Sequence, residues 1–272
     1  MSRKTIRVDI PIDKPDETIK LLEDINEKHI ALGVTSPLTT FFDMPDIIAR
    51  TLDAKAKRKA AQVAFGASQS NYNQSATLCG IAKGQNKQTK GTLYVMVCSL
   101  RDFLQLKFRN NPEELSNWGF EVVITQTGGR RNVAITVPVD TPENLIKLCT
   151  SISDKHIADG VGSILNNSEV DMAIFTTVLG NAATFLNNST EQSAIRQSNN
   201  NQADNIIGYA EGQTSDTPGT LYYDITGIRD RLLNKYAGTE EMLSEYGFKV
   251  VIGTSSLPDE ETPPPAPPTP VP

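Results

Sequence analysis

The sequence predicts a mainly helical protein built from two tandem homologous four-helix-bundle modules, each with a short terminal β-strand pair, plus a Pro-rich tail. Three observations lead to this fold class. The chain repeats itself over almost its whole length, and four segments of each copy have the apolar spacing of amphipathic helices. The ends of each copy alternate apolar and polar residues, as half-buried strands do.

The internal repeat is visible when the sequence is shifted along itself. With a shift of 127 residues, Thr5–Val34 aligns with Asn132–Val161 and shows 13 identities in 30 positions. With a shift of 128, Gln69–Gln74 aligns with Gln197–Gln202. One net insertion therefore lies between Val161 and Gln197 of the second copy.

This repeat sets the expected domain organisation. One module covers residues 1–127 and a second covers 130–253. The remaining residues, 254–272, form a tail in which seven of the last ten residues are proline. Such a composition builds no packed core, so we expect the tail to be disordered or extended.

Each copy begins with a strand and a helix. In the first copy, the strand alternates apolar residues over 6–12. The helix that follows is expected to end at Gly33, and its counterpart at Gly160, because glycine tolerates the positive φ of a helix terminus. The following valines, Val34 and Val161, are expected to make the usual hydrophobic contact at that terminus.

Three further helices complete the predicted bundle of each copy. In the first copy they run from Pro45 to about Phe65, from the Gln/Asn-rich segment to Gln85, and onward from about Thr92. A strand over 120–124 closes the copy. Four amphipathic helices with short connections favour an antiparallel bundle, beside which the first and last strands of the copy are expected to pair.

The boundary between the copies has the signature of a β-hairpin. Segments 120–125 and 132–139 have strand character and flank Thr127-Gly128-Gly129. A ribbon of this kind would link the copies and leave outer strand edges open. We therefore expect assembly through the terminal strands and the tail, which contains Pro264-x-x-Pro267.

Composition excludes several classes of protein. The net charge of −6 argues against general nucleic-acid binding, and no apolar run is long enough for a membrane span. The first residues show no apolar signal-peptide core, so we expect a cytoplasmic protein, exported only within an assembled particle. Cys79, Cys98 and Cys149 lack metal-ligand spacing and indicate a reducing compartment. No metal, cofactor or catalytic constellation is predicted.

A candidate polar cluster stands out because both copies retain it. It consists of His29, Gln69, Asn73, Gln74, His156, Gln197, Asn201 and Gln202. The histidines are either ligands or general bases, or residues of the last helical turn that oppose the dipole and bond a polar partner. The amides either bind a polar ligand or form a buried network that fixes the bundle register. A joint interpretation has His29 bonding one of these amides.

The end of the first copy resembles a known group of proteins. Asn111-Pro112-Glu113-Glu114-Leu115, then Trp118-Gly119-Phe120 and a valine-rich strand, are similar to uncharacterised helical-bundle proteins of Bacteroidota-type bacteria. The resemblance implies a bacterial helical protein and no particular activity.

Two classes of function follow from these observations. The first is a non-enzymatic structural or interaction protein that binds protein partners, self-associates as a homo-oligomer, or belongs to a larger bacterial or phage-like assembly. This class is favoured because both copies retain glycines, core positions and strands. The alternative is a small polar ligand-binding protein or enzyme that uses the paired His and Asn/Gln residues.

Overall fold

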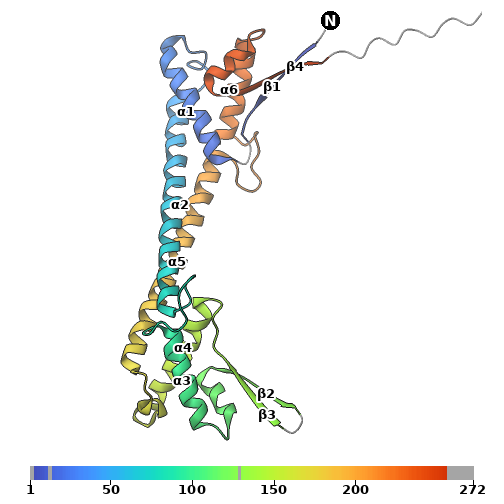
Figure 1. Cartoon of the computed structure of the whole chain (residues 1–272). Helices are drawn as coiled ribbons and strands as arrows, with labels where there is room; N and C mark the ends of the chain where they lie inside the picture. Colours follow the sequence, from blue (N-terminus) through green and yellow to red (C-terminus); the bar gives the residue numbers. More distant parts are fainter. Residues whose placement is uncertain (1–2, 12–13, 128–129, 256–272) are drawn as a thin grey trace, which may run out of the picture. The chain divides into compact units, whose positions relative to one another are not determined.

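The computed structural model describes residues 3–11, 14–127 and 130–255 and is mainly helical, with two small antiparallel sheets (Figure 1). The helices are α1 (Pro15–Leu32), α2 (Met44–Cys79), α3 (Leu93–Lys107), α4 (Pro142–Asp159), α5 (Met172–Ile207) and α6 (Leu221–Lys235). Short 3-10 helices are η1 (Gly33–Thr35), η2 (Pro112–Trp118), η3 (Gly160–Gly162), η4 (Ile164–Asn167) and η5 (Glu240–Tyr246). The strands are β1 (Arg3–Asp9), β2 (Glu121–Thr127), β3 (Arg130–Thr136) and β4 (Lys249–Ser255).

The elements recur at the spacing of the sequence repeat. β1, α1 and η1 are followed 127 positions later by β3, α4 and η3, whereas α2, α3, η2 and β2 are followed 128 positions later by α5, α6, η5 and β4. The net insertion therefore lies in the loop between η3 and α5, which contains η4.

Contacts divide the chain into two compact units that each combine parts of both copies. The terminal unit consists of Met1–Ala60 and Ser198–Pro272, and the central unit consists of Ala61–Gln197. Both α2 and α5 cross the boundary between these ranges. The expected modules, 1–127 and 130–253, therefore do not coincide with the compact units.

Strand pairing also joins the two copies, which corrects the prediction that each copy pairs its own two strands. β2 pairs with β3, from Glu121↔Thr136 to Thr127↔Arg130, which confirms the predicted hairpin. β1 pairs with β4, from Arg3↔Ser255 to Asp9↔Lys249, so the two ends of the described chain share one sheet. The short connection after β2 brings β3 back beside it and leaves β1 and β4 to pair with each other.

The hydrophobic cores show the same exchange. The core of the terminal unit takes eight buried residues from the first copy and eight from the second, among them Ile25, Leu38, Ile207 and Tyr246. The core of the central unit takes nine from each copy, among them Leu104 and Ile152. Each core is therefore complete only when both copies contribute to it.

The predicted second and third helices of each copy are one continuous helix, so the prediction of four helices per copy is wrong. α2 runs for 36 residues through the Gln/Asn-rich segment, and α5 has the same length. Small residues such as Ala61, Ser68 and Ser75 are buried at helical spacing and extend the inward-facing stripe. Their low hydrophobicity hides the continuity of the helix from a search for apolar residues.

The predicted tail lies mostly outside the described residues. β4 extends to Ser255, so Thr254 and Ser255 belong to a strand instead of the tail. Residues 256–272, including Pro264-x-x-Pro267, are outside the described part of the chain. The expectation of a disordered or extended tail therefore stays a prediction.

Candidate functional site

Both histidines bond a serine in the loop that follows their own helix. His29 Nδ1 lies 2.8 Å from Ser36 Oγ, and His156 Nδ1 lies 2.7 Å from Ser163 Oγ. The two serines are buried, and each hydroxyl also accepts the backbone N–H two residues later at 3.4 Å. Each histidine therefore holds the loop after the first helix of its copy, which is a structural contact.

The amides of the candidate cluster lie on exposed helix surface, contrary to a buried network. All six amide residues (Gln69, Asn73, Gln74, Gln197, Asn201 and Gln202) are exposed. Gln74 donates to Ser70 at 3.2 Å and Gln202 to Ser198 at 3.1 Å, within their own helices. Among the described residues, the structure joins no histidine of the cluster to an amide by a hydrogen bond, so the joint interpretation is not supported.

The buried polar residues of this segment are serines, which the sequence prediction missed. In the central unit, Ser68 donates to the carbonyl oxygen of Ser189 at 2.9 Å and lies 2.8 Å from the Ser193 hydroxyl. Ser75 donates to the carbonyl oxygen of Ala182 at 2.9 Å. These bonds join α2 to α5 where their side chains are small enough for close approach.

The glycines end the first helices as predicted, but the expected valine contacts are wrong. Gly33 and Gly160 have φ of +53° and +54° and directly follow α1 and α4. Val34 is 94% exposed and Val161 is 104% exposed, so neither packs against its helix. The His–Ser bond takes the place of that hydrophobic contact in fixing the loop.

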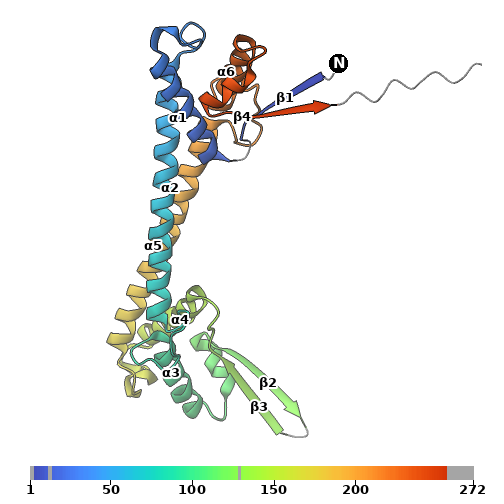
Figure 2. The same ribbon diagram turned by 45° about the horizontal axis from the view of Figure 1, so that its top comes forward.

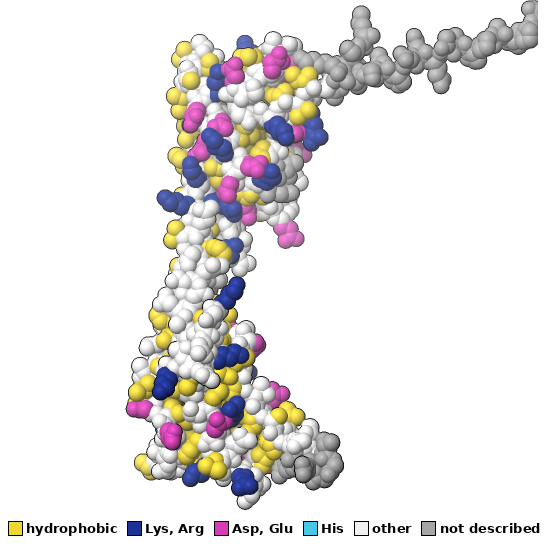
Figure 3. Space-filling view, viewed as in Figure 1, with side chains coloured by type: hydrophobic (Ala, Val, Ile, Leu, Met, Phe, Trp, Pro, Cys, Tyr) yellow, Lys and Arg dark blue, Asp and Glu magenta, His cyan; other side chains and the backbone are white. Residues whose placement is uncertain are grey.

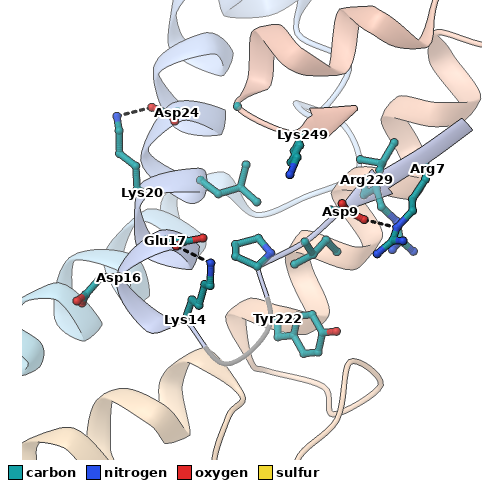
Figure 4. A pocket seen from close by; sticks show the side chains of 15 residues that line it. Arg7, Asp9, Lys14, Asp16, Glu17, Lys20, Asp24, Tyr222, Arg229 and Lys249 are labelled. Carbon is teal, nitrogen blue, oxygen red and sulfur yellow. Dashed lines mark hydrogen bonds and ion pairs between the residues drawn. The ribbon is translucent and has the colours of Figure 1, made fainter. Parts of the chain in front are cut away.

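The terminal unit contains an open cleft of about 820 Å³ where β1, α1, α6 and β4 meet. Arg7, Asp9, Arg229 and Lys249 line the side formed by the strands and α6, and we call the three basic residues among them the basic wall (Figure 4). The side that faces it, at or just before α1, is lined by Lys14, Asp16, Glu17, Lys20 and Asp24. The sequence comparison did not single out this cleft.

Ion pairs neutralise most of the cleft but leave positive charge on the basic wall. Glu17 pairs with Lys14 and Asp24 with Lys20, and Asp16, which also lines this side, pairs with Arg58. On the opposite side, Arg7 pairs with Asp9 and Arg229 with Asp230, whereas Lys249 forms no ion pair among the described residues. The face in Figure 3 shows cationic and anionic side chains interspersed over the terminal unit, as these local pairs require.

The central unit has an equivalent cleft of about 450 Å³ with different chemistry. Lys147, Leu148 and Gly119 line it, as Lys20, Leu21 and Gly247 line the cleft of the terminal unit. The positions equivalent to the basic wall are Ala134, Arg101 and Glu121. The shared backbone frame therefore holds a basic wall in the terminal unit and a neutral one in the central unit.

A glycine is required in each cleft just before one of its strands, β2 in the central unit and β4 in the terminal unit. Gly119 and Gly247 have φ of +88° and +85°. A Cβ on Gly119 would lie 2.6 Å from Cβ of Ser151, and one on Gly247 would lie 2.8 Å from Cβ of Asp24. These glycines let the start of the strand approach the facing helix, which is α4 for Gly119 and α1 for Gly247.

Each two-stranded ribbon has an apolar face that continues beyond the core of its unit. In the terminal unit, the pair Val8↔Val250 packs against the core, and Ile6↔Ile252 lies two residues farther out on the same face. In the central unit, Val122↔Ile135 packs against the core and Ile124↔Val133 lies farther out. Ile252 is 43% exposed and Ile124 is 38% exposed, so the outer part of each face is uncovered.

The ribbons extend away from the helices of their own units (Figure 2). In the register of an antiparallel pair, residues directly opposite each other share a face, and the face alternates along the strand. We call the face that includes Ile6 and Ile252, or Ile124 and Val133, the inner face of its ribbon. Thr125 and Val251 lie on the opposite faces.

Within the described ranges, no group of three or more His, Cys, Asp or Glu side chains is arranged to hold a metal ion. The thiols of Cys79 and Cys149 are buried in the core of the central unit. Burial raises the pKa of Cys79 to about 12 and raises that of Cys149 well above its ordinary value. Neither thiol is an activated nucleophile.

The helices themselves and comparisons with known proteins both bear on the class of protein. None of the helices in the described part of the chain combines the length and apolarity that a membrane crossing requires. The chain matches no protein-family model, no curated protein and no solved structure. The chemistry of the two clefts and the two ribbons therefore has to be interpreted from this chain alone.

Proposed function

We propose that this chain is a non-enzymatic structural or interaction protein that self-associates, or binds protein partners of a larger bacterial or phage-like assembly, through its two ribbons. The observation that carries the proposal is the uncovered apolar inner face of each ribbon, represented by Ile252 and Ile124. The same feature occurs in both units, and the aligned segments Val122-Val123-Ile124 and Val250-Val251-Ile252 are identical. This recurrence supports a role in binding beyond what folding of one unit requires.

Burial of the inner faces contributes to the driving force for binding. Full burial of an isoleucine side chain contributes about 1.5–3 kcal/mol relative to exposure. Ile252 and Ile124 start 43% and 38% exposed, so each gains only part of that amount on binding. Several such side chains across two ribbons, together with a polar rim, suit a reversible protein–protein contact.

The strand edges add a second means of binding. Each described sheet has only two strands, so every strand has one edge without a strand neighbour in the described part of the chain. An incoming extended segment can pair with such an edge through main-chain hydrogen bonds. Edge pairing provides affinity, and the apolar inner face provides side-chain selectivity.

The test is the molar mass of the full chain by size-exclusion chromatography with light scattering over a range of concentrations. We expect the mass to increase with concentration, and Ile124→Lys with Ile252→Lys to return the chain to a monomer. Thr125→Lys and Val251→Lys, on the opposite faces of the same strands, are the matched controls and should leave the mass unchanged. Thermal melts of all variants verify that the fold is retained.

The opposite result favours the alternative function. A wild-type chain that stays monomeric at every concentration, shows no partner-dependent mass, and melts at a higher temperature when a small polar ligand is added would overturn the proposal. The ligand-binding alternative would then rest on His29, His156 and the exposed amides of α2 and α5.

A further inference from the structure

We propose that the basic wall of the terminal unit binds the acidic segment Asp259-Glu260-Glu261 of a second copy of this chain. The inference deepens the proposed function and rests on the self-association proposed there. It adds a defined electrostatic contact at the base of one ribbon, distinct from the apolar inner faces.

The basic wall has the charge that such a segment needs. Arg7, Arg229 and Lys249 line one side of the cleft, and Lys249 has no ion-pair partner among the described residues. Arg229 pairs only with Asp230, its neighbour in sequence, on the surface of α6. Both basic side chains are therefore available for charge-assisted hydrogen bonds to carboxylates.

Comparison of the two units shows that the fold does not require this charge. The equivalent cleft of the central unit has Ala134 in place of Arg7 and Glu121 in place of Lys249. Both units keep the lysine and the leucine of the first helix and the glycine before the strand. Both clefts thus share these three lining positions, whereas the basic wall belongs to the terminal unit alone, as expected for a binding feature.

The chain itself supplies a complementary ligand. Residues 256–272 follow β4 and contain Asp259, Glu260 and Glu261 in succession, with no Lys, Arg or His. Three adjacent carboxylates match a wall of three cations.

The length of the connection favours a second copy over the same chain. β4 leads away from the cleft, and Ser255 lies six residues beyond Lys249, which is about 20 Å along a strand. Asp259 and Glu261 follow Ser255 by only four and six residues. A reversal of direction uses about two residues, which leaves roughly 7–13 Å of extended chain for the return. Within one chain, therefore, at most the backbone of Glu261 can return to the level of Arg7, which lies opposite Val251, and the three carboxylates cannot meet all three cations at once.

The experiment measures binding of a labelled peptide of residues 256–272 by fluorescence anisotropy. The receptor is the full chain with Asp259→Asn, Glu260→Gln and Glu261→Gln, so that its own acidic segment does not compete. We expect saturable binding that weakens as salt is added, because the contact is electrostatic and exposed. Lys249→Glu, which copies the central unit, should weaken the affinity at least tenfold.

Two controls define the site. Lys147→Glu, in the equivalent cleft of the central unit, should leave the affinity unchanged. The peptide with the same three acid-to-amide substitutions should not bind. Equal binding of the acidic and amide peptides, or equal loss with Lys147→Glu and Lys249→Glu, would overturn the proposal.

Light scattering on the full chain separates this inference from the proposed function. Lys249→Glu should lower the concentration-dependent mass, while Ile252→Lys should leave peptide affinity unchanged. If the peptide fails to bind but the inner-face variants still abolish association, the acidic contact is wrong and the proposed function stands. If the peptide binds but the wild-type mass is independent of concentration, the segment does not act between copies, and that part of the proposal fails.

Discussion

Arg50 and Asp224 join α2 to α6 in the terminal unit, with Arg50 Nη2 2.8 Å from Asp224 Oδ2. The equivalent positions in the central unit are Val178 and Met96. These two positions are therefore ionic in the terminal unit and part of the apolar core in the central unit. Arg50 also donates to the carbonyl oxygen of Gly219 at 2.9 Å, which ties the loop before α6 into the contact.

The first prediction concerns the pH dependence of this contact. Burial raises the pKa of Asp224, and Arg50 opposes that rise only in part. Because the folded-state pKa lies above the unfolded value, the contribution of Asp224 to stability is present below the unfolded pKa and is lost as pH rises through the folded pKa. We expect urea unfolding at a series of pH values to show that Asp224→Asn removes this loss.

Asp230→Asn is the control for that measurement, because the Asp230 side chain is 56% exposed. Its free energy of unfolding should follow the wild-type pH dependence. If the free energy of unfolding varied with pH in the same way for the wild type and Asp224→Asn, the prediction would be contradicted.

A second prediction tests the glycine at the base of the terminal ribbon. Gly247→Ala should destabilise the protein by about 1–3 kcal/mol more than Gly238→Ala, because overpacking adds to the cost of a positive φ. Both glycines have positive φ, +85° and +91°, but only Gly247 has a neighbour within 4 Å of the added Cβ. Chemical denaturation measures the two losses, and equal losses would show that the approach to Asp24 is unimportant.

Thiol reactivity provides a third prediction. Cys79 and Cys149 are buried, and burial raises the pKa of both thiols, whereas Cys98 is partly exposed. A thiol reagent at neutral pH should modify Cys98 of the native chain rapidly and the other two only after unfolding. Cys98→Ser should remove the fast phase. Rapid modification of all three native thiols would contradict the buried core of the central unit.

The fourth prediction addresses the paired His–Ser contacts. His29→Ala leaves the buried Ser36 hydroxyl without its ring partner, and loss of such a bond costs about 1–3 kcal/mol. His156→Ala should have the same effect through Ser163. A double-mutant cycle between His29→Ala and Ser36→Ala should give a coupling free energy of about 0.5–1.5 kcal/mol. Unchanged melting temperatures in both histidine variants would refute the structural role.

Local patterns predicted the local elements well. Alternation found the strands but not their bounds, since β1 is Arg3–Asp9 where 6–12 was predicted and β3 is Arg130–Thr136 where 132–139 was predicted. Gly33 and Gly160 marked the ends of α1 and α4. The helical spacing of Ile19, Leu22, Ile25 and Ile30 indicates one face of α1, of which the first three are buried and Ile30 is 66% exposed. Long-range pairing was missed for a physical reason. Residues such as Ile19 and Ile146, or Leu21 and Leu148, are identical in the two copies, so side-chain chemistry alone does not distinguish partners within a copy from partners across copies.

The candidate site was missed because it lies in differences between the copies. A search for retained residues selected the histidines and amides, which the structure places in loop contacts and on exposed helix faces. The basic wall depends on Arg7 and Lys249, which Ala134 and Glu121 replace in the other copy. A comparison of charge between aligned positions is the signal that would have found it.

Because each unit combines parts of both copies, the two units can finish folding only at different times during synthesis. The central unit is one continuous segment, Ala61–Gln197, and its core is available as soon as that segment has left the ribosome. Residues 1–60 are made first but wait for Ser198 onward, and the last strand of their unit ends only at Ser255. At about 5–20 residues per second, that delay is roughly 10–40 s. Throughout this interval the apolar face of α1 lacks the eight core residues that the second copy contributes, so residues 1–60 are where we expect chaperones to bind during synthesis.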